Sequence, residues 1–287
     1  MSLTINTNLN SLNAQRNLNA SQMSLSTSMQ RLSSGLRVNS AKDDAAGLAI
    51  ASRMDSQVRG MTVAVRNAND GISLSQTAEG ALGKISDSLQ RMRELSVQAS
   101  NATNSSSDKD SLDKEFGELA KEIQRVSGGT SFNGMHILGA NAGAQAFQVG
   151  AGTTSNDTIA INTVDLTSDA TITAVAGTDN TGTGRAVIDN TATAAAIHTV
   201  IDNIDTAIGT VNTQRSAMGA SQSRFDSVIS NLQVSVENQS AARSRIMDAD
   251  FAAETANLSR SNILQQAGNA MIAQANQLPQ QVLQLLR

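Results

Sequence analysis

The chain has 287 residues and a formal net charge of −4, which disfavours nucleic acid as its principal partner. It contains no Cys, so disulfides and thiolate metal sites are excluded, and no apolar run approaches the roughly 20 residues that a membrane span needs. Aromatic residues make up only 2% of the chain, and its single Pro is Pro279. Thin layers of long helices therefore fit the composition better than one thick core.

The first 40 residues are amphipathic, rich in Ser and Asn, and free of acidic side chains. Leu18, Leu25, Leu32 and Leu36 recur at heptad-like spacing, which predicts a helix with one narrow apolar seam. The same composition is compatible with an organellar transit peptide. Against that alternative, the segment shares its acid-free character with the C-terminus, which a removable leader would not need to mirror.

Two further helices are predicted before the middle of the chain. Residues 40–44 contain Ser and Asp side chains suited to cap a helix that begins near Ala45 and runs to about Ala99. A polar turn follows, and a third helix carries apolar residues at helical spacing until Gly128 and Gly129 end it.

From Ser131 the composition changes to Gly, Ala, Thr, Asn and Asp. Short β-branched runs at residues 147–149, 159–161 and 171–173 predict strands and hairpins in a small insertion that ends near residue 195. Helical periodicity then returns from Ile197 and forms the longest heptad series in the chain.

A break in the helical pattern at residues 247–251 precedes the last helix. No acidic residue follows Glu254, and most polar positions are amides, which can pack against copies of themselves without like-charge repulsion. A lone helix cannot bury the apolar seam of this segment, so we expect it to be buried in an assembly. The seam consists of Leu264, Met271, Leu278, Val282 and Leu285.

The order of elements is symmetric about the insertion. It predicts a mainly α fold in which the N- and C-terminal segments form a long antiparallel coiled coil or helical bundle, with a small β-rich insertion at the tip. We expect three domains. They are a terminal coiled-coil core of residues 1–44 and 243–287, a helical bundle of residues 45–139 and 197–242, and a variable insertion of residues 140–196.

Catalytic motifs find little support in the sequence. His136 and His198 lie in different segments without metal-ligand spacing, and the glycines around Thr183 do not form a phosphate-binding loop. The acidic pair Asp43 and Asp44 is better explained as a helix cap than as a calcium site. We therefore predict no enzymatic activity, no cofactor and no metal.

Long motifs at both ends resemble the bacterial flagellin family. At the N-terminus they span residues 5–8, 33–41 and 43–50, and at the C-terminus residues 242–246, 248–252 and 282–287. The resemblance implies the subunit of an extracellular filament, exported unfolded without a cleaved signal peptide and added at the distal tip. It also implies a helical homopolymer, with an export chaperone, a cap protein and hook-junction proteins as further partners and no membrane partner.

The charged run on the second helix has two interpretations. From composition alone it is a solvated helical face. The family resemblance matches it instead to the segment that the animal Toll-like flagellin receptor recognises. The matching positions are Gln90, Arg91, Arg93, Glu94, Leu95, Val97 and Glu115.

Two alternatives remain beside a filament subunit. A hook–filament junction protein shares similar terminal helices, but the agreement through residues 127–128, 132–134 and 147–150 favours flagellin. A flagellin with a metalloprotease insertion would need an HExxH motif, and residues 140–196 contain none.

Overall fold

The computed structural model describes the backbone of residues 7–285 and the side chains of residues 7–277. The chain forms two compact units. Unit 1 contains the chain up to Val58 and from Glu237 onward, and unit 2 is Arg59–Val236. Among the described helices, none is both long enough and apolar enough to cross a membrane. The predicted mainly α fold with a small β-rich insertion is confirmed.

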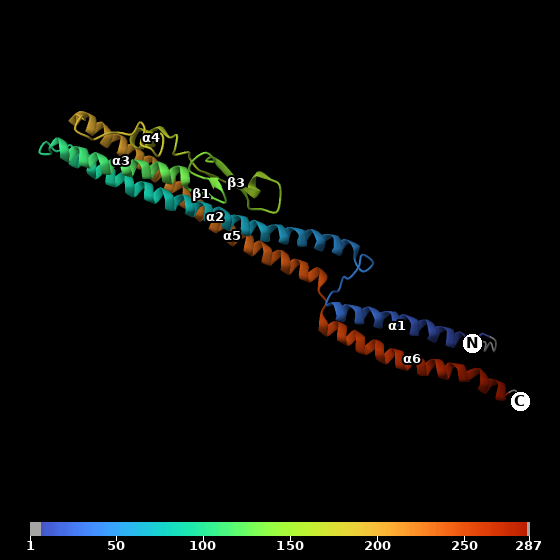
Figure 1. The fold of residues 1–287 in the computed structure, drawn as a ribbon. Coiled ribbons are helices and arrows are strands. Elements are labelled where there is room, and N and C mark those ends of the chain that lie inside the picture. Colours follow the sequence, from blue (N-terminus) through green and yellow to red (C-terminus); the bar gives the residue numbers. More distant parts are fainter. Residues whose placement is uncertain (1–6, 286–287) are drawn as a thin grey trace. The chain divides into compact units, whose positions relative to one another are not determined.

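The helices account for most of the chain (Figure 1). Helix α1 is Leu9–Ser34 and helix α6 is Phe251–Leu285, and both belong to unit 1. Two long helices, α2 (Ala45–Ala99) and α5 (Ala194–Met247), contribute to both units. Helix α3 is Ser106–Gly129.

In unit 1 the two breaks between helices, at residues 35–44 and 248–250, are joined by backbone hydrogen bonds. Gly35 ends α1 with a φ of 72°, a left-handed conformation that costs glycine little. The Arg37 N–H donates to the Met247 carbonyl at 2.6 Å, and the Ala249 N–H donates to the Gly35 carbonyl at 2.9 Å. We call this pair of bonds the break ladder. Both breaks therefore form one structural element rather than two independent loops.

The start of α2 confirms the predicted cap. Asp44 accepts a hydrogen bond from the Gly47 N–H at 2.7 Å, while Asp43 accepts from Ser40 and Asn39. These hydrogen bonds lower the pKa of Asp43 below its usual value. The acidic pair thus organises the turn between the break and the helix.

In unit 2, α2, α3 and α5 share one hydrophobic core. Buried side chains recur along each helix in heptad steps, so each helix contributes one apolar stripe. Leu82, Leu89 and Met92 lie on α2, and Ile204 and Met218 on α5, all almost completely buried. The long heptad series that begins at Ile197 is therefore a core series.

The segment between α3 and α5 contains two small antiparallel sheets. Strands β1 (Ser131–Phe132) and β2 (Met135–His136) flank a two-residue turn in which Asn133 and Gly134 adopt positive φ angles, as such tight hairpins require. Strands β3 (Ala144–Gln148) and β4 (Thr158–Asn162) pair along their whole length, with a short 3₁₀ helix, η1 (Ser155–Asp157), before β4.

The predicted strand at residues 171–173 is wrong, because this segment belongs to helix α4 (Ala170–Ala176). Asp169 caps the helix by accepting from the Thr171 N–H at 2.8 Å. Ile172 and Val175 then lie three residues apart on one buried face. The cap and this spacing outweigh the β preference of the branched side chains.

Arg185 fastens the end of the insertion to α3. Its guanidinium donates to both carboxylate oxygens of Asp113, at 2.9 and 2.5 Å, and lies 6.0 Å from the centre of the Phe116 ring. The Ile188 N–H adds a third hydrogen bond to Asp113 at 3.0 Å. The insertion is thereby part of the core packing of unit 2.

Candidate assembly groove

Helices α1 and α6 pack closely because small residues line their contact. Ser11 and Ser28 of α1 and Ser261 and Ala275 of α6 are buried between the helices. A Cβ atom at Gly268 would lie only 3.2 Å from the side chain of Leu18. Bulky side chains on this stripe would force the helices apart.

Polar contacts fix the antiparallel pairing of α1 and α6. The Asn8 side-chain amide donates to the Ala275 carbonyl at 2.7 Å, and the Ser21 hydroxyl donates to the Ser261 carbonyl at 3.2 Å. These bonds couple residues near the two chain ends directly. The two terminal helices therefore lie side by side, as the sequence predicts (Figure 1).

One ion pair lies between the helices, joining Arg31 to Glu254 at 3.0 Å. Burial alone would raise the pKa of Glu254, but hydrogen bonds from Arg31 and Ser28 outweigh it and hold the pKa below its usual value. Glu254 is the last acidic residue of the chain, and it is buried here rather than solvated.

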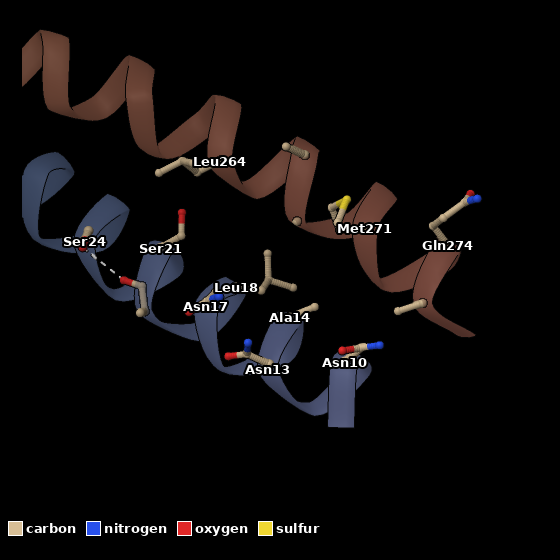
Figure 2. A pocket seen from close by; sticks show the side chains of 14 residues that line it. Asn10, Asn13, Ala14, Asn17, Leu18, Ser21, Ser24, Leu264, Met271 and Gln274 are labelled. Carbon is tan, nitrogen blue, oxygen red and sulfur yellow. Dashed lines mark hydrogen bonds between the residues drawn. The ribbon is translucent and has the colours of Figure 1, made fainter. Parts of the chain in front are cut away.

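A groove of about 810 Å³ runs along this helix pair (Figure 2). Its apolar lining includes Leu18 from α1 and Leu264 and Met271 from α6, while Asn, Ser and Gln side chains form the rest of its walls. Leu264 is 52% exposed and Met271 is 63% exposed. The groove is thus an open apolar surface bordered by uncharged polar groups.

The predicted seam residues differ in burial between the two helices. Leu18, Leu25, Leu32 and Leu36 are half-buried, whereas Leu264 and Met271 are exposed. The side chains of Leu278, Val282 and Leu285 lie outside the described residues. Helix α6 faces α1 instead with residues in a different heptad phase, namely Glu254, Leu258, Ser261, Gln265, Gly268, Ile272 and Ala275.

This second phase explains what the sequence reasoning missed. Helix α6 carries two stripes with the same period of seven, one large and apolar and one mostly small. Period alone does not distinguish them, and the bulkier stripe is the more obvious one. A cue was available in the spacing of Ser261, Gly268 and Ala275, because close helix approach needs small side chains.

The helix pair leaves other large apolar side chains uncovered. Exposed apolar areas of this kind are typical of interaction surfaces. The exposed positions are Leu9, Leu12, Met23 and Met29 on α1, and Phe251, Ile263, Leu264 and Met271 on α6.

The charged face of α2 forms a second candidate surface. Arg91 bridges two carboxylates, with Glu115 of α3 at 2.8 Å and Glu94 at 2.9 Å. Arg93 makes a two-point contact with Asp205 of α5, at 2.6 and 3.2 Å. The hydrogen bond to Glu115 is the main cause that raises the pKa of Arg91, and the one to Asp205 does the same for Arg93.

Not all predicted recognition residues share this surface. Gln90 and Val97 are exposed like the two arginines, but Leu95 is completely buried in the core of unit 2. Asp205 was missed by the sequence reasoning. Its only signal is an acidic side chain beside the buried Ile204 in the α5 heptad series, and a pairing across helices cannot be derived from that.

Among the described residues, no group of three or more His, Asp or Glu side chains is placed to hold a metal ion. His198 lies 3.2 Å from the Ser100 hydroxyl, at the end of α2.

The paired terminal helices and their open groove define a mainly helical protein whose terminal helix pair carries an exposed apolar surface. Family models agree: residues 5–142 match the bacterial flagellin N-terminal helical region, and residues 201–286 match the bacterial flagellin C-terminal helical region. The chain belongs to the bacterial flagellin family, a family of structural filament proteins.

Individual relatives match over their full length. A flagellin of Halalkalibacterium halodurans is 46% identical over 283 residues, covering 99% of both chains, and one of Bacillus subtilis is 42% identical with the same coverage. A flagellin of Xenorhabdus nematophila is 44% identical and covers all of both chains. A crystal structure of Bacillus cereus flagellin covers 58% of this chain and 88% of its own at 35% identity, with a TM-score of 0.48.

Proposed function

We propose that this chain polymerises into the bacterial flagellar filament through its terminal helix pair. The observation that carries the proposal is the set of large apolar side chains left open on α1 and α6, together with the groove between them. The same proposal includes export in unfolded form, growth at the distal tip, and an extracellular location. An export chaperone, a cap protein and hook-junction proteins are its further partners.

Burial drives the proposed assembly. Each large apolar side chain removed from water contributes about 1.5–3 kcal/mol before the cost of association is subtracted. The uncharged walls of the groove add no charge repulsion between copies. In this proposal residues 1–44 and 243–287 form the filament core, residues 45–139 and 197–242 the surrounding bundle, and residues 140–196 the variable insertion.

Deletion of residues 264–287 tests the proposal. The truncated chain lacks one wall of the groove, so we expect it to remain helical in unit 2 but to lose polymerisation. Circular dichroism reports the helix content, and sedimentation after addition of short filament seeds reports the polymer. Normal filaments from the truncated chain would rule out this assembly surface.

The same seeds distinguish the alternative of a hook–filament junction protein. A filament subunit extends the seeds without other proteins, and the seeds lengthen with its concentration. A junction protein binds a seed end and stops. Measured seed lengths by electron microscopy separate the two outcomes.

We further propose that the charged face of α2 is the surface that the host Toll-like flagellin receptor recognises. Supporting it are the exposed side chains of Arg91, Arg93 and Glu115, held in fixed positions by their ion pairs. Leu95 contributes by packing the helix from inside, since it is completely buried. Gln90, Glu94 and Val97 complete the surface.

Substitution of Arg91 by Ala tests this second proposal. We expect the response of cells bearing the receptor to need at least about tenfold more protein, because Arg is enriched among the interface hot spots whose truncation costs about 2 kcal/mol or more. Arg125→Ala is the matched control, since Arg125 is also exposed and paired within its own helix, with Glu122. Equal responses from the two variants would contradict the proposal.

A further inference from the structure

Among the described methionines, the three most exposed lie on the terminal helices. Met23 and Met29 on α1 are 66% and 56% exposed, and Met271 on α6 is 63% exposed. Met92 and Met218, in the core of unit 2, are 0% and 1% exposed. Figure 2 shows the sulfur of Met271 among the side chains that line the groove. Reactive sulfur thus coincides with the surface assigned to assembly.

We propose that Met23, Met29 and Met271 are a peroxide-sensitive modification site, and that their oxidation in the free subunit blocks its assembly. This inference rests on the proposed function, because it regulates the same surface. The oxidant is hydrogen peroxide, and the product is methionine sulfoxide.

The reaction is a two-electron oxidation of each thioether. A sulfur lone pair attacks one peroxide oxygen, the O–O bond breaks, and an S–O bond forms. The other oxygen takes up the remaining protons and leaves as water, so sulfur is oxidised and peroxide is reduced. The sulfur must meet the peroxide directly, so exposed methionines react while buried ones are protected.

The sulfoxide changes what assembly must bury. Methionine packs as a flexible apolar side chain, whereas its sulfoxide is polar and accepts hydrogen bonds. At Met271 the neighbouring apolar groups Leu18 and Leu264 offer no donor, although the Asn, Ser and Gln side chains of the same groove could partly compensate. Burying an incompletely paired polar group still costs enough to weaken association at least about tenfold.

Peroxide treatment of the full-length monomer tests the inference. Peptide mass spectrometry follows each sulfoxide, and sedimentation follows growth onto filament seeds. We expect Met23, Met29 and Met271 to oxidise well before Met92 and Met218, with at least about a tenfold loss of assembly. A methionine sulfoxide reductase should restore it. Full assembly of chains that carry all three sulfoxides would overturn the inference.

Variants separate this site from other damage. Replacing all three residues by Leu keeps apolar helix formers and should leave assembly resistant to peroxide. Met135→Leu is the matched control, because Met135 is also exposed but lies in β2, outside the terminal pair, and its removal should leave the sensitivity unchanged. Met271→Gln, a polar replacement, should weaken assembly without any oxidant. A protective Met135→Leu or an undisturbed Met271→Gln would contradict the inference.

A failure of the proposed function can be distinguished from a failure of this inference. If the untreated chain does not grow onto seeds, assembly by this surface is wrong. If the untreated chain grows and the oxidised chain grows equally well, only the modification site is wrong.

Discussion

Gly71 allows α2 and α5 to pack closely because it has no side chain. A Cβ atom there would lie 2.7 Å from the ring of Phe225 on α5, and that ring in turn packs edge-on against Phe147 of β3, with centroids 5.8 Å apart. The glycine, the α5 ring and the β3 ring form one contact. The position of the hairpin therefore depends on a residue that contributes no side chain.

Gly71→Ala is expected to destabilise unit 2. Overpacking costs about 1–3 kcal/mol, which exceeds the gain of about 0.5–1 kcal/mol from replacing glycine within a helix. Gly80→Ala on the same helix is the control, because a Cβ atom there meets nothing within 4 Å, and it should stabilise by that smaller amount. Thermal unfolding followed by circular dichroism measures both, and a stabilised Gly71→Ala would contradict the packing.

Asp113 makes the attachment of the insertion sensitive to acid. Its burial would raise the pKa of the carboxyl group, but the hydrogen bonds from Arg185 and the Ile188 N–H outweigh this and lower it. A lowered folded-state pKa means that the stabilisation is present above the unfolded value of about 4 and is lost as the pH falls through the folded value.

Asp113→Asn should therefore cost about 2–3 kcal/mol at neutral pH, since it leaves Arg185 without its charged partner. The difference in stability between the variant and the parent should shrink as the pH falls below about 4. Hydrogen exchange of residues 177–190 from pH 7 to pH 3 measures the attachment. A pH-independent difference would show that the carboxylate charge does not hold the insertion.

Helix α3 begins with a capping box. The Ser105 hydroxyl accepts from the Asp108 N–H at 3.2 Å, while the Asp108 carboxylate accepts from the Ser105 N–H at 2.9 Å. Ser105→Ala should lower the free energy of unfolding by about 1 kcal/mol. Ser106→Ala, one residue further on, should stay within about 0.5 kcal/mol. Denaturant titration by circular dichroism compares them, and equal losses would argue against the cap.

Elements with a clear period or a clear end could be predicted from the sequence. The bounds of α2 at Ala45 and Ala99 follow from a cap and a polar turn, and the runs around Phe147 and Ile159 lie in paired strands. Contacts between distant segments could not be predicted. The pairing of Arg185 with Asp113 and the choice of stripe on α6 depend on which surfaces meet, and local patterns do not contain that information.

On the scale of the whole molecule, apolar burial is unequal between the two units. Among the described residues, the large, fully buried side chains belong to unit 2, whereas the buried apolar residues of unit 1 are Val38, Ala51 and Ala275. Regions with little apolar burial open at low free-energy cost. We therefore expect unit 1 to be the less stable of the two units in the free chain.

Hydrogen exchange should show this difference directly. In the free subunit, amides of α1 and α6 are expected to exchange at least about a hundredfold faster than those of Leu89 and Ile204, and polymerisation should slow them. Mass spectrometry of peptides from free and assembled protein measures both. Equal protection of the two units in the free chain would contradict the unequal burial.

The break ladder fixes the register of α1 relative to α6. From the bond between Gly35 and Ala249, α1 runs back and α6 runs forward, and matching contacts follow at nearly equal steps, from Arg31 with Glu254 to Asn8 with Ala275. A change of length in one helix would therefore misalign every contact beyond it. Paired insertions or deletions of whole heptads, one in each helix, are the length changes that this alignment tolerates.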